Sequence, residues 1–191
     1  VTLACLGYLN EPQRTNLLLY NSDWTNAAWT AGGGASKVGQ TVTFGANYTD
    51  YIFQNVACTV GQTYTHSVWL QAPVGLAFEV SITEVGGAFP STATPVVGTG
   101  APQLVSVTRT ITSETTMSAR LVATGVAVTV TLLSPGHQLE LGATATSTIP
   151  TTGASATRAA DVAYVDVATW LPALSMTNAT FYAEFVAADS G

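Results

Sequence analysis

Residues 62–71, QTYTHSVWLQ, decide the fold of this chain. Successive side chains of a β-strand point to opposite faces of a sheet, so alternation along the sequence separates an inner face from an outer one. One alternate set is mainly apolar and is expected to face the core: Tyr64, His66, Val68 and Leu70. The other set is mainly polar and is expected to face outward: Thr65, Ser67, Trp69 and Gln71. The segment therefore predicts a half-buried β-strand.

Segments of the same kind lie on both sides of this strand. In residues 126–133, VAVTVTLL, the valines and threonines of the alternating part face opposite ways. Glycine and proline separate the segments and mark turns between them. The other predicted strands are residues 14–20, 38–44, 51–57, 76–83, 103–111, 117–123 and 137–141. Many short strands with turn residues between them are typical of a sandwich, so we predict an all-β jelly-roll β-sandwich.

The composition favours strands over helices and excludes some partners. Of the 191 residues, 47% are hydrophobic and only 8% are charged, whereas a typical soluble domain has roughly 25% charged residues. The net charge is −6, Lys37 is the single lysine, and the arginines are scattered. Nucleic-acid binding needs clustered basic residues, so we expect no nucleic-acid partner. No apolar run is long enough for a transmembrane helix, so we expect no membrane insertion.

The chain divides into four predicted parts. Residues 1–13 are a connector or the end of an upstream unit, and residues 14–142 are the sandwich. Residues 143–160, rich in Ala, Thr and Ser, are predicted to be a linker. Residues 161–191 hold two more strand-like segments. Because an unpaired terminal strand would leave an exposed edge, we expect these strands to begin a second, truncated β-domain.

Three stretches, taken in order, resemble a module of bacteriophage tail proteins and other virion proteins. They are RTNLLLYNSDWTNAAWT at 14–30, GQTYTHSVWLQA at 61–72 and GHQLELGATATSTIPTTGASATRAADV at 136–162. That module is similar to the jelly-roll sandwiches of carbohydrate-binding modules. The resemblance implies a structural protein of the virion, in a tail fibre or another appendage. It also implies partners among the other virion proteins and copies of itself, usually as a trimer, and a concanavalin-like domain at 161–191.

The resemblance raises the question of a structural calcium ion, which related carbohydrate-binding jelly rolls often hold. Thr25 occupies the first position at which those modules carry an acidic residue. The nearest carboxylates are Asp23 and Glu140, and they are the only calcium candidates. Calcium takes six to eight oxygen ligands, so two dispersed acids are a weak basis for a site. We therefore predict no cofactor.

No motif in the sequence indicates catalysis. His66 lies on the predicted core face, and His137 follows a Pro-Gly turn at a strand start. Nucleophile elbows, zinc-protease motifs, phosphate loops and dinucleotide fingerprints are missing from the sequence. No two acidic residues are marked as the partners that a glycosidase needs. We therefore predict that the chain is not an enzyme.

Cys5 and Cys58 are either a disulfide or two small buried side chains, and the sequence leaves both alternatives open.

The aromatic residues are a better guide to binding. A tryptophan between hydroxyl and amide side chains can stack on a sugar while its neighbours bind the sugar's hydroxyl groups. We therefore predict a tentative glycan face of Trp69, Gln71, Ser67 and Thr65. The alternative is that a neighbouring subunit or a loop covers Trp69.

Two other segments are candidates for a ligand site. Tyr48 and Tyr51 flank Asp50 near a strand start. Residues 84–102 read as a long Gly/Pro/Thr loop, and long loops inside compact domains are often functional.

The sequence as a whole predicts a non-enzymatic structural module, located on a phage virion, that mediates assembly and helps to attach the particle to a host surface. One alternative is a glycan-binding module, and both roles are compatible in one protein. Another alternative is an accessory domain of a polysaccharide-degrading enzyme.

Overall fold

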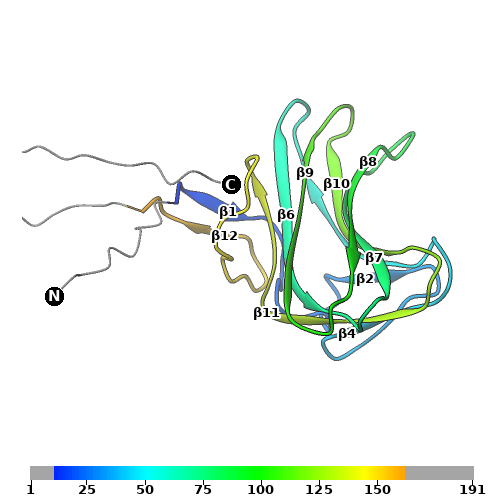
Figure 1. Ribbon diagram of the computed structural model, residues 1–191. Coiled ribbons are helices and arrows are strands. Elements are labelled where there is room, and N and C mark those ends of the chain that lie inside the picture. The colour runs from blue at the N-terminus through cyan, green and yellow to red at the C-terminus, as the bar shows by residue number, and fades with distance from the viewer. Residues whose placement is uncertain (1–10, 162–191) are drawn as a thin grey trace, which may run out of the picture. The chain divides into compact units, whose positions relative to one another are not determined.

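The computed structural model describes residues 11–161, which form an all-β sandwich (Figure 1). These residues contain no helix, as the sequence predicts. The strands are β1 (Arg14–Asn16), β2 (Thr30–Gly32), β3 (Ser36–Val38), β4 (Thr41–Phe44), β5 (Tyr51–Ala57), β6 (Thr63–Gln71), β7 (Ala77–Glu84), β8 (Ser91–Val97), β9 (Gln103–Thr110), β10 (Thr116–Ala123), β11 (Val128–Leu141) and β12 (Ala156–Arg158). Within the described residues, no helix is long and apolar enough to span a membrane.

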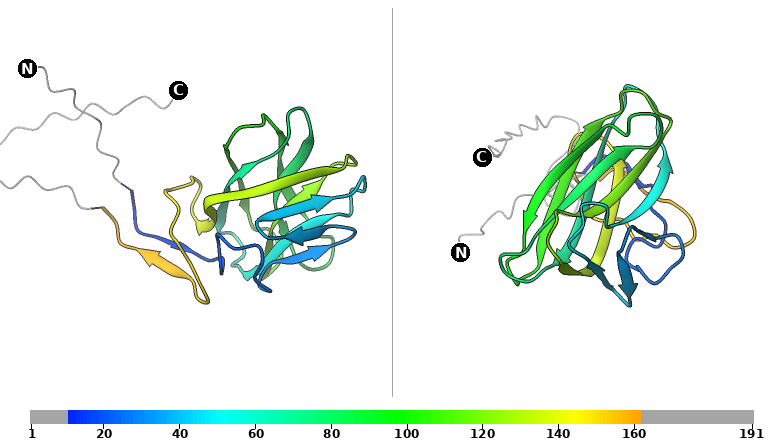
Figure 2. Two further views of the ribbon diagram at one scale, coloured as in Figure 1. Left: turned by 90° about the horizontal axis from the view of Figure 1, so that it is seen from below. Right: turned by 90° about the vertical axis from the view of Figure 1, so that its right-hand side faces the viewer.

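Two five-stranded sheets make up the sandwich (Figures 1 and 2). Sheet I has the order β3-β4-β11-β6-β9, and sheet II has the order β2-β5-β10-β7-β8. All strand pairs are antiparallel. From β4 to β11 the chain crosses between the sheets at every connection except that from β7 to β8. Four adjacent strands of each sheet, β4-β11-β6-β9 and β5-β10-β7-β8, have the jelly-roll order, which confirms the predicted fold.

The core lies between the two sheets. The inner face of β6 is the one that the alternation predicts: Tyr64, His66, Val68 and Leu70 are all buried. Trp24 and Trp29, from the turn-rich segment between β1 and β2, are also fully buried and lie beside the His137 ring. The sequence pattern thus identifies the inner face correctly, because burial of apolar side chains against a second sheet needs this period of two.

The segment predicted to be a long loop at 84–102 contains a strand, so that prediction is wrong. Residues 91–97 form β8, the edge strand of sheet II, which pairs with β7. Pro95 has no N–H to donate, and an edge strand tolerates it because one side of its backbone needs no partner.

The two strands predicted at 126–133 and 137–141 form one strand, β11, with a register shift between Leu132 and His137.

Residues 143–160 are not a free linker. The segment 143–149, called the exit strap below, returns over the outer face of sheet I, and Ile149 donates its N–H to the side chain of Gln138. Further along, β12 pairs with β1 as a two-stranded ribbon at one side of the sandwich (Figure 1). Long-range contacts therefore fix a segment whose composition alone resembles a linker. Residues 1–10 and 162–191, including Cys5 and the strands predicted there, lie outside the described residues.

Candidate functional site

The outer face of sheet II carries a cluster of aromatic and polar side chains. Along β5, Ile52 faces the core, so Tyr51 and Phe53 face outward. Along β10, Met117, Ala119 and Leu121 face the core, so Ser118 and Arg120 face outward. The strand register then sets Arg120 directly between Phe53 of β5 and Ser81 of β7.

Arg120 lies over both aromatic rings of this face. Its guanidinium carbon is 5.1 Å from the centroid of the Tyr51 ring and 5.9 Å from that of Phe53. The two rings are 5.4 Å apart and tilted by 55°. These distances are those of cation–π contacts. Burial lowers the pKa of Arg120, and the nearby Tyr51 partly opposes that change. The guanidinium is thus held in one place on the sheet.

Three polar atoms beside the rings have no hydrogen-bond partner among the described residues. They are Nε of Arg120 and the hydroxyl oxygens of Ser81 and Ser118, and all three are buried. Buried polar groups in proteins nearly always have partners, so three in one place need an explanation. Glu79 lies two residues before Ser81 on the same face of β7 and adds a carboxylate. Tyr51, Phe53, Glu79, Ser81, Ser118 and Arg120 are called the arginine–aromatic face below.

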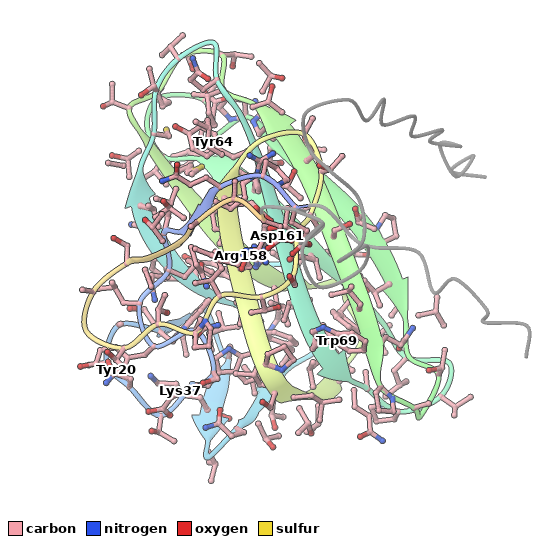
Figure 3. The ribbon with its side chains drawn as sticks, turned by 90° about the vertical axis from the view of Figure 1, so that its left-hand side faces the viewer. Tyr20, Lys37, Tyr64, Trp69, Arg158 and Asp161 are labelled. Carbon is pink, nitrogen blue, oxygen red and sulfur yellow. The ribbon has the colours of Figure 1, made fainter. Side chains whose placement is uncertain are left out.

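The opposite side of the sandwich carries Trp69, which is half-buried on the outer face of sheet I (Figure 3). It lines a groove of about 820 Å³ together with Pro102, Leu104, Leu133, Pro135 and residues 145–148 of the exit strap. Gln71, two residues further along β6, lines a neighbouring hollow of about 520 Å³. Trp69 and Gln71 therefore lie on a surface that is open in the described part of the chain, and glycan contact there stays a prediction.

The other two residues of the predicted glycan face are covered. Thr65 is 1% exposed and Ser67 is 2% exposed. The Thr65 hydroxyl donates to the carbonyl of Gly142, at the start of the exit strap. In the register of sheet I, Thr65 and Ser67 lie opposite Glu140 and Gln138. Both of these side chains bind the strap at Thr146. The expectation that Thr65 and Ser67 face a ligand is wrong, because a segment distant in sequence lies over them.

The two calcium candidates have separate structural roles. The Glu140 carboxylate is fully buried and accepts hydrogen bonds from Gln138, from the backbone N–H of Thr146 and from the Thr146 hydroxyl. Arg14 lies 3.3 Å from it. Asp23 accepts hydrogen bonds from the backbone and hydroxyl of Thr25, which lower its pKa. Among residues 11–161, no group of three or more acidic, histidine or cysteine side chains could hold a metal ion.

Two further buried carboxylates belong to the scaffold. Asp50 is fully buried and accepts hydrogen bonds from the backbone of Gly34 and Gly45, while Tyr48 is 76% exposed. The proposed site between Tyr48 and Tyr51 therefore has no free carboxylate. Glu84 is also fully buried and is bound by Arg109 and by the backbone of residues 112–114.

Sequence reasoning missed the arginine–aromatic face, although part of its signal is local. The alternation in YIFQN at 51–55 already puts Tyr51 and Phe53 on one face, and the alternation in MSARL at 117–121 does so for Ser118 and Arg120. What the sequence does not show is that β5 and β10 are neighbours in register. That pairing brings the arginine to the rings.

Comparisons with known proteins give only solved structures of low sequence identity. No protein-family model matches the sequence, and no curated protein is significantly similar to it. A solved structure described as "CBM4 structure and function" is 19% identical over 60% of this chain and 95% of its own, with a TM-score of 0.48. The CBM22-1 xylan-binding domain from Paenibacillus barcinonensis is 10% identical over 69% of this chain and 94% of its own, with a TM-score of 0.46. The enzymatically active domain of tailspike protein 4 from bacteriophage CBA120 is 10% identical over 66% of this chain but only 21% of its own, with a TM-score of 0.47.

Proposed function

We propose that this chain is a non-catalytic glycan-binding module whose ligand lies on the arginine–aromatic face of sheet II. The observation that supports the proposal is the unused hydrogen-bonding capacity beside two outward-facing rings. Arg120 contacts Tyr51 and Phe53, yet its Nε and two neighbouring serine hydroxyls have no partner among the described residues. These three atoms are covered in the chain alone, so a ligand satisfies them only where it displaces the side chains that cover them.

A sugar ring matches this combination of groups. It has an apolar face, which can pack on the rings of Tyr51 and Phe53, and hydroxyl groups around its edge. Arg120 donates hydrogen bonds, the Glu79 carboxylate accepts them, and a serine hydroxyl does either. The cation–π contacts already hold the guanidinium in place, so a ligand loses less free energy in ordering it.

Affinity electrophoresis and isothermal titration with soluble polysaccharides test this proposal. Xylan, mannan, galactan and mixed-linkage glucan are suitable neutral probes. We expect at least one to bind the wild-type chain, and we expect Phe53→Ala and Arg120→Ala to weaken that binding at least tenfold. Ser106→Ala, on the exposed face of β9, is the matched control, since it changes an outward serine of the other sheet.

Folding must be checked in each variant, because a sheet substitution can also destabilise the strand. Arg120→Lys keeps the charge but not the planar guanidinium, so it should fold normally and still bind weakly. If Phe53→Ala and Arg120→Ala fold and bind every probe as the wild type does, the proposal is wrong.

We also propose that the module serves in a phage virion, on the outside of a tail fibre or another appendage, where it contacts other virion proteins and copies of itself. The resemblance of residues 14–30, 61–72 and 136–162 supports this role. So does the path of the chain: the N–H of Asp161 donates to the carbonyl of Glu11, and the N–H of Glu11 donates to the Asp161 carboxylate. A module that the chain enters and leaves side by side is easily carried on a longer protein.

The particle itself provides the test of the virion role. Cryo-electron microscopy of assembled virions should place the chain in an appendage in three copies, with its sheet II face toward solvent. A face that is instead covered by a neighbouring subunit would contradict host-surface binding there but would support assembly.

A further inference from the structure

The groove over Trp69 has an apolar floor and walls with few polar groups. Trp69 lies directly opposite Leu104 in the pairing of β6 with β9, and Leu104 is 52% exposed. Leu133, Pro102 and Pro135 complete the apolar lining. A concave surface of this size, mainly apolar and with a small number of polar atoms, is typical of a small-ligand site.

The surface continues along β6 into the hollow at Gln71, where the lining is polar. Thr129 and Thr131 of β11 lie there, and Thr131 is directly opposite Gln71. The amide nitrogen of Gln71 donates to the carbonyl of Gly100 at 2.6 Å. No donor among the described residues reaches its amide oxygen, which is free to accept a hydrogen bond. One loop borders both hollows, since Pro102 lines the first and Gly100 the second.

We infer that this surface is a second saccharide-binding site, separate from the arginine–aromatic face, for a neutral oligosaccharide that lies along β6. One sugar ring stacks on Trp69 between the leucine side chains, and the next ring donates a hydrogen bond to the amide oxygen of Gln71 and forms hydrogen bonds with the hydroxyl groups of Thr129 and Thr131. Residues 69 and 71 are two positions apart on one strand, so their Cα atoms are about 7 Å apart. The surface thus has one position for stacking, at Trp69, followed by one for hydrogen bonding, at Gln71. An oligosaccharide can use both, because each of its rings has an apolar face and hydroxyl groups.

Other occupants fit the groove less well. β6 is paired on both sides, with β11 and β9, so its backbone has no free edge to which a peptide strand could be added. The polar hollow at Gln71 does not suit a lipid chain. Among the described residues, Glu11 is the only charged residue that lines the groove over Trp69, and its carboxylate is paired with Arg158, so the lining has no free cation to attract nucleic acids or other anionic polymers.

Tryptophan fluorescence gives a direct readout of this site. Trp24 and Trp29 are buried, at 0% and 1% exposed, whereas Trp69 is half-buried. We expect acrylamide to quench Trp69 and xylohexaose, mannohexaose or cellohexaose to protect it. The protection should disappear in Trp69→Phe. Trp170 lies outside the described residues, and Trp170→Phe serves as the matched control that should keep the protected signal.

Titration of two variants separates this site from the one proposed on sheet II. Arg120→Ala should keep the protection of Trp69, and Trp69→Ala with Gln71→Ala should remove it while leaving the binding that depends on Arg120. Protection of Trp69 by none of the three hexaoses would overturn the inference, and so would protection by an alkyl detergent alone. Loss of all binding in Arg120→Ala, with Trp69 protection lost as well, would also overturn it, because a single site would then explain the data.

Discussion

Nε2 of His66 and Nδ1 of His137 lie 2.9 Å apart in the core, and both side chains are fully buried. The indole N–H of Trp24 donates to Nε2 of His137 at 2.9 Å. An indole nitrogen can only donate, so Nε2 of His137 is unprotonated and its Nδ1 carries the proton. That proton is donated to His66, whose own proton is then on Nδ1. Nδ1 of His66 lies near the backbone of Ser81 but has no hydrogen bond of ordinary geometry. The two histidines therefore belong to the scaffold, and both are neutral in the folded chain.

The buried pair should make the stability of the fold depend on pH. Burial lowers the pKa of His66 to about 4. Burial also lowers the pKa of His137, and the repulsion between the two rings when both are protonated lowers it further. In the unfolded chain both have a pKa near 6.5. The unfolded state therefore takes up protons first as the pH falls. The contribution of the neutral histidines to the free energy of unfolding is fully present above about pH 6.5. It is lost as the pH falls from 6.5 to about 4, and for His66 alone the loss is on the order of 3 kcal/mol.

Urea unfolding between pH 5 and 8 measures this dependence. In that window the carboxylates of Glu84 and Glu11 stay ionised, because the pKa of each is lowered below its ordinary value. A free energy of unfolding that is flat from pH 8 to pH 5 would contradict the neutral pair. A His66→Gln, His137→Gln variant, if it folds, is the control and should lose the dependence.

A second prediction concerns Glu84, which fixes the turn between β9 and β10. Burial would raise its pKa, but hydrogen bonds from the backbone of Ser113 and Thr112 and from Arg109 lower it overall. Glu84→Gln removes the charge and leaves Arg109 partly buried without its partner. Since breaking a buried ion pair on one side costs about 3–5 kcal/mol, we expect a loss of that order. Chemical denaturation measures it, and Glu114→Gln is the matched control. A loss no larger than that of the control would refute the role of Glu84.

A third prediction concerns the exit strap, which Glu11 holds in place. Its carboxylate accepts hydrogen bonds from the N–H and the hydroxyl of Ser147 and forms an ion pair with Arg158. In Glu11→Ala we expect the amides of Ser147 and Thr146 to exchange hydrogen faster, because the strap loosens. The amides of β6 should keep their protection. The same exchange rate at Ser147 in variant and wild type would show that Glu11 does not hold the strap.

The strap also shows how far the sequence can predict this molecule. The inner face of β6 is predictable because burial against a sheet enforces a local period of two, which the order of Tyr64, His66, Val68 and Leu70 displays. The outer face is only half predictable. Trp69 and Gln71 are open, but Thr65 and Ser67 lie beside Glu140 and Gln138, whose side chains bind residues 143–149. Nothing local in β6 indicates that cover. Likewise, Arg120 meets Phe53 only because β10 pairs with β5 in one particular register.

The last prediction uses the unpartnered hydroxyl of Ser118, which is fully buried on the arginine–aromatic face. A buried hydroxyl without a partner costs stability, so Ser118→Ala should raise the free energy of unfolding by about 1 kcal/mol. Because Ser118 is 0% exposed, a ligand contacts its hydroxyl only by moving the side chains over it, and in that case the same substitution should weaken glycan binding several-fold. Stability and binding would then change in opposite directions, as at sites where function is retained at a cost in stability.

Parallel denaturation and titration of Ser118→Ala and the exposed control Ser106→Ala decide between the two roles of this hydroxyl. Ser106→Ala should change neither quantity, since its side chain is exposed on the other sheet. A Ser118→Ala variant that is less stable than the wild type would mean that the hydroxyl has a partner within the fold. A variant that is more stable and binds as well as the wild type would remove Ser118 from the site, and the unpartnered atoms of Ser81 and Arg120 alone would then have to account for the ligand.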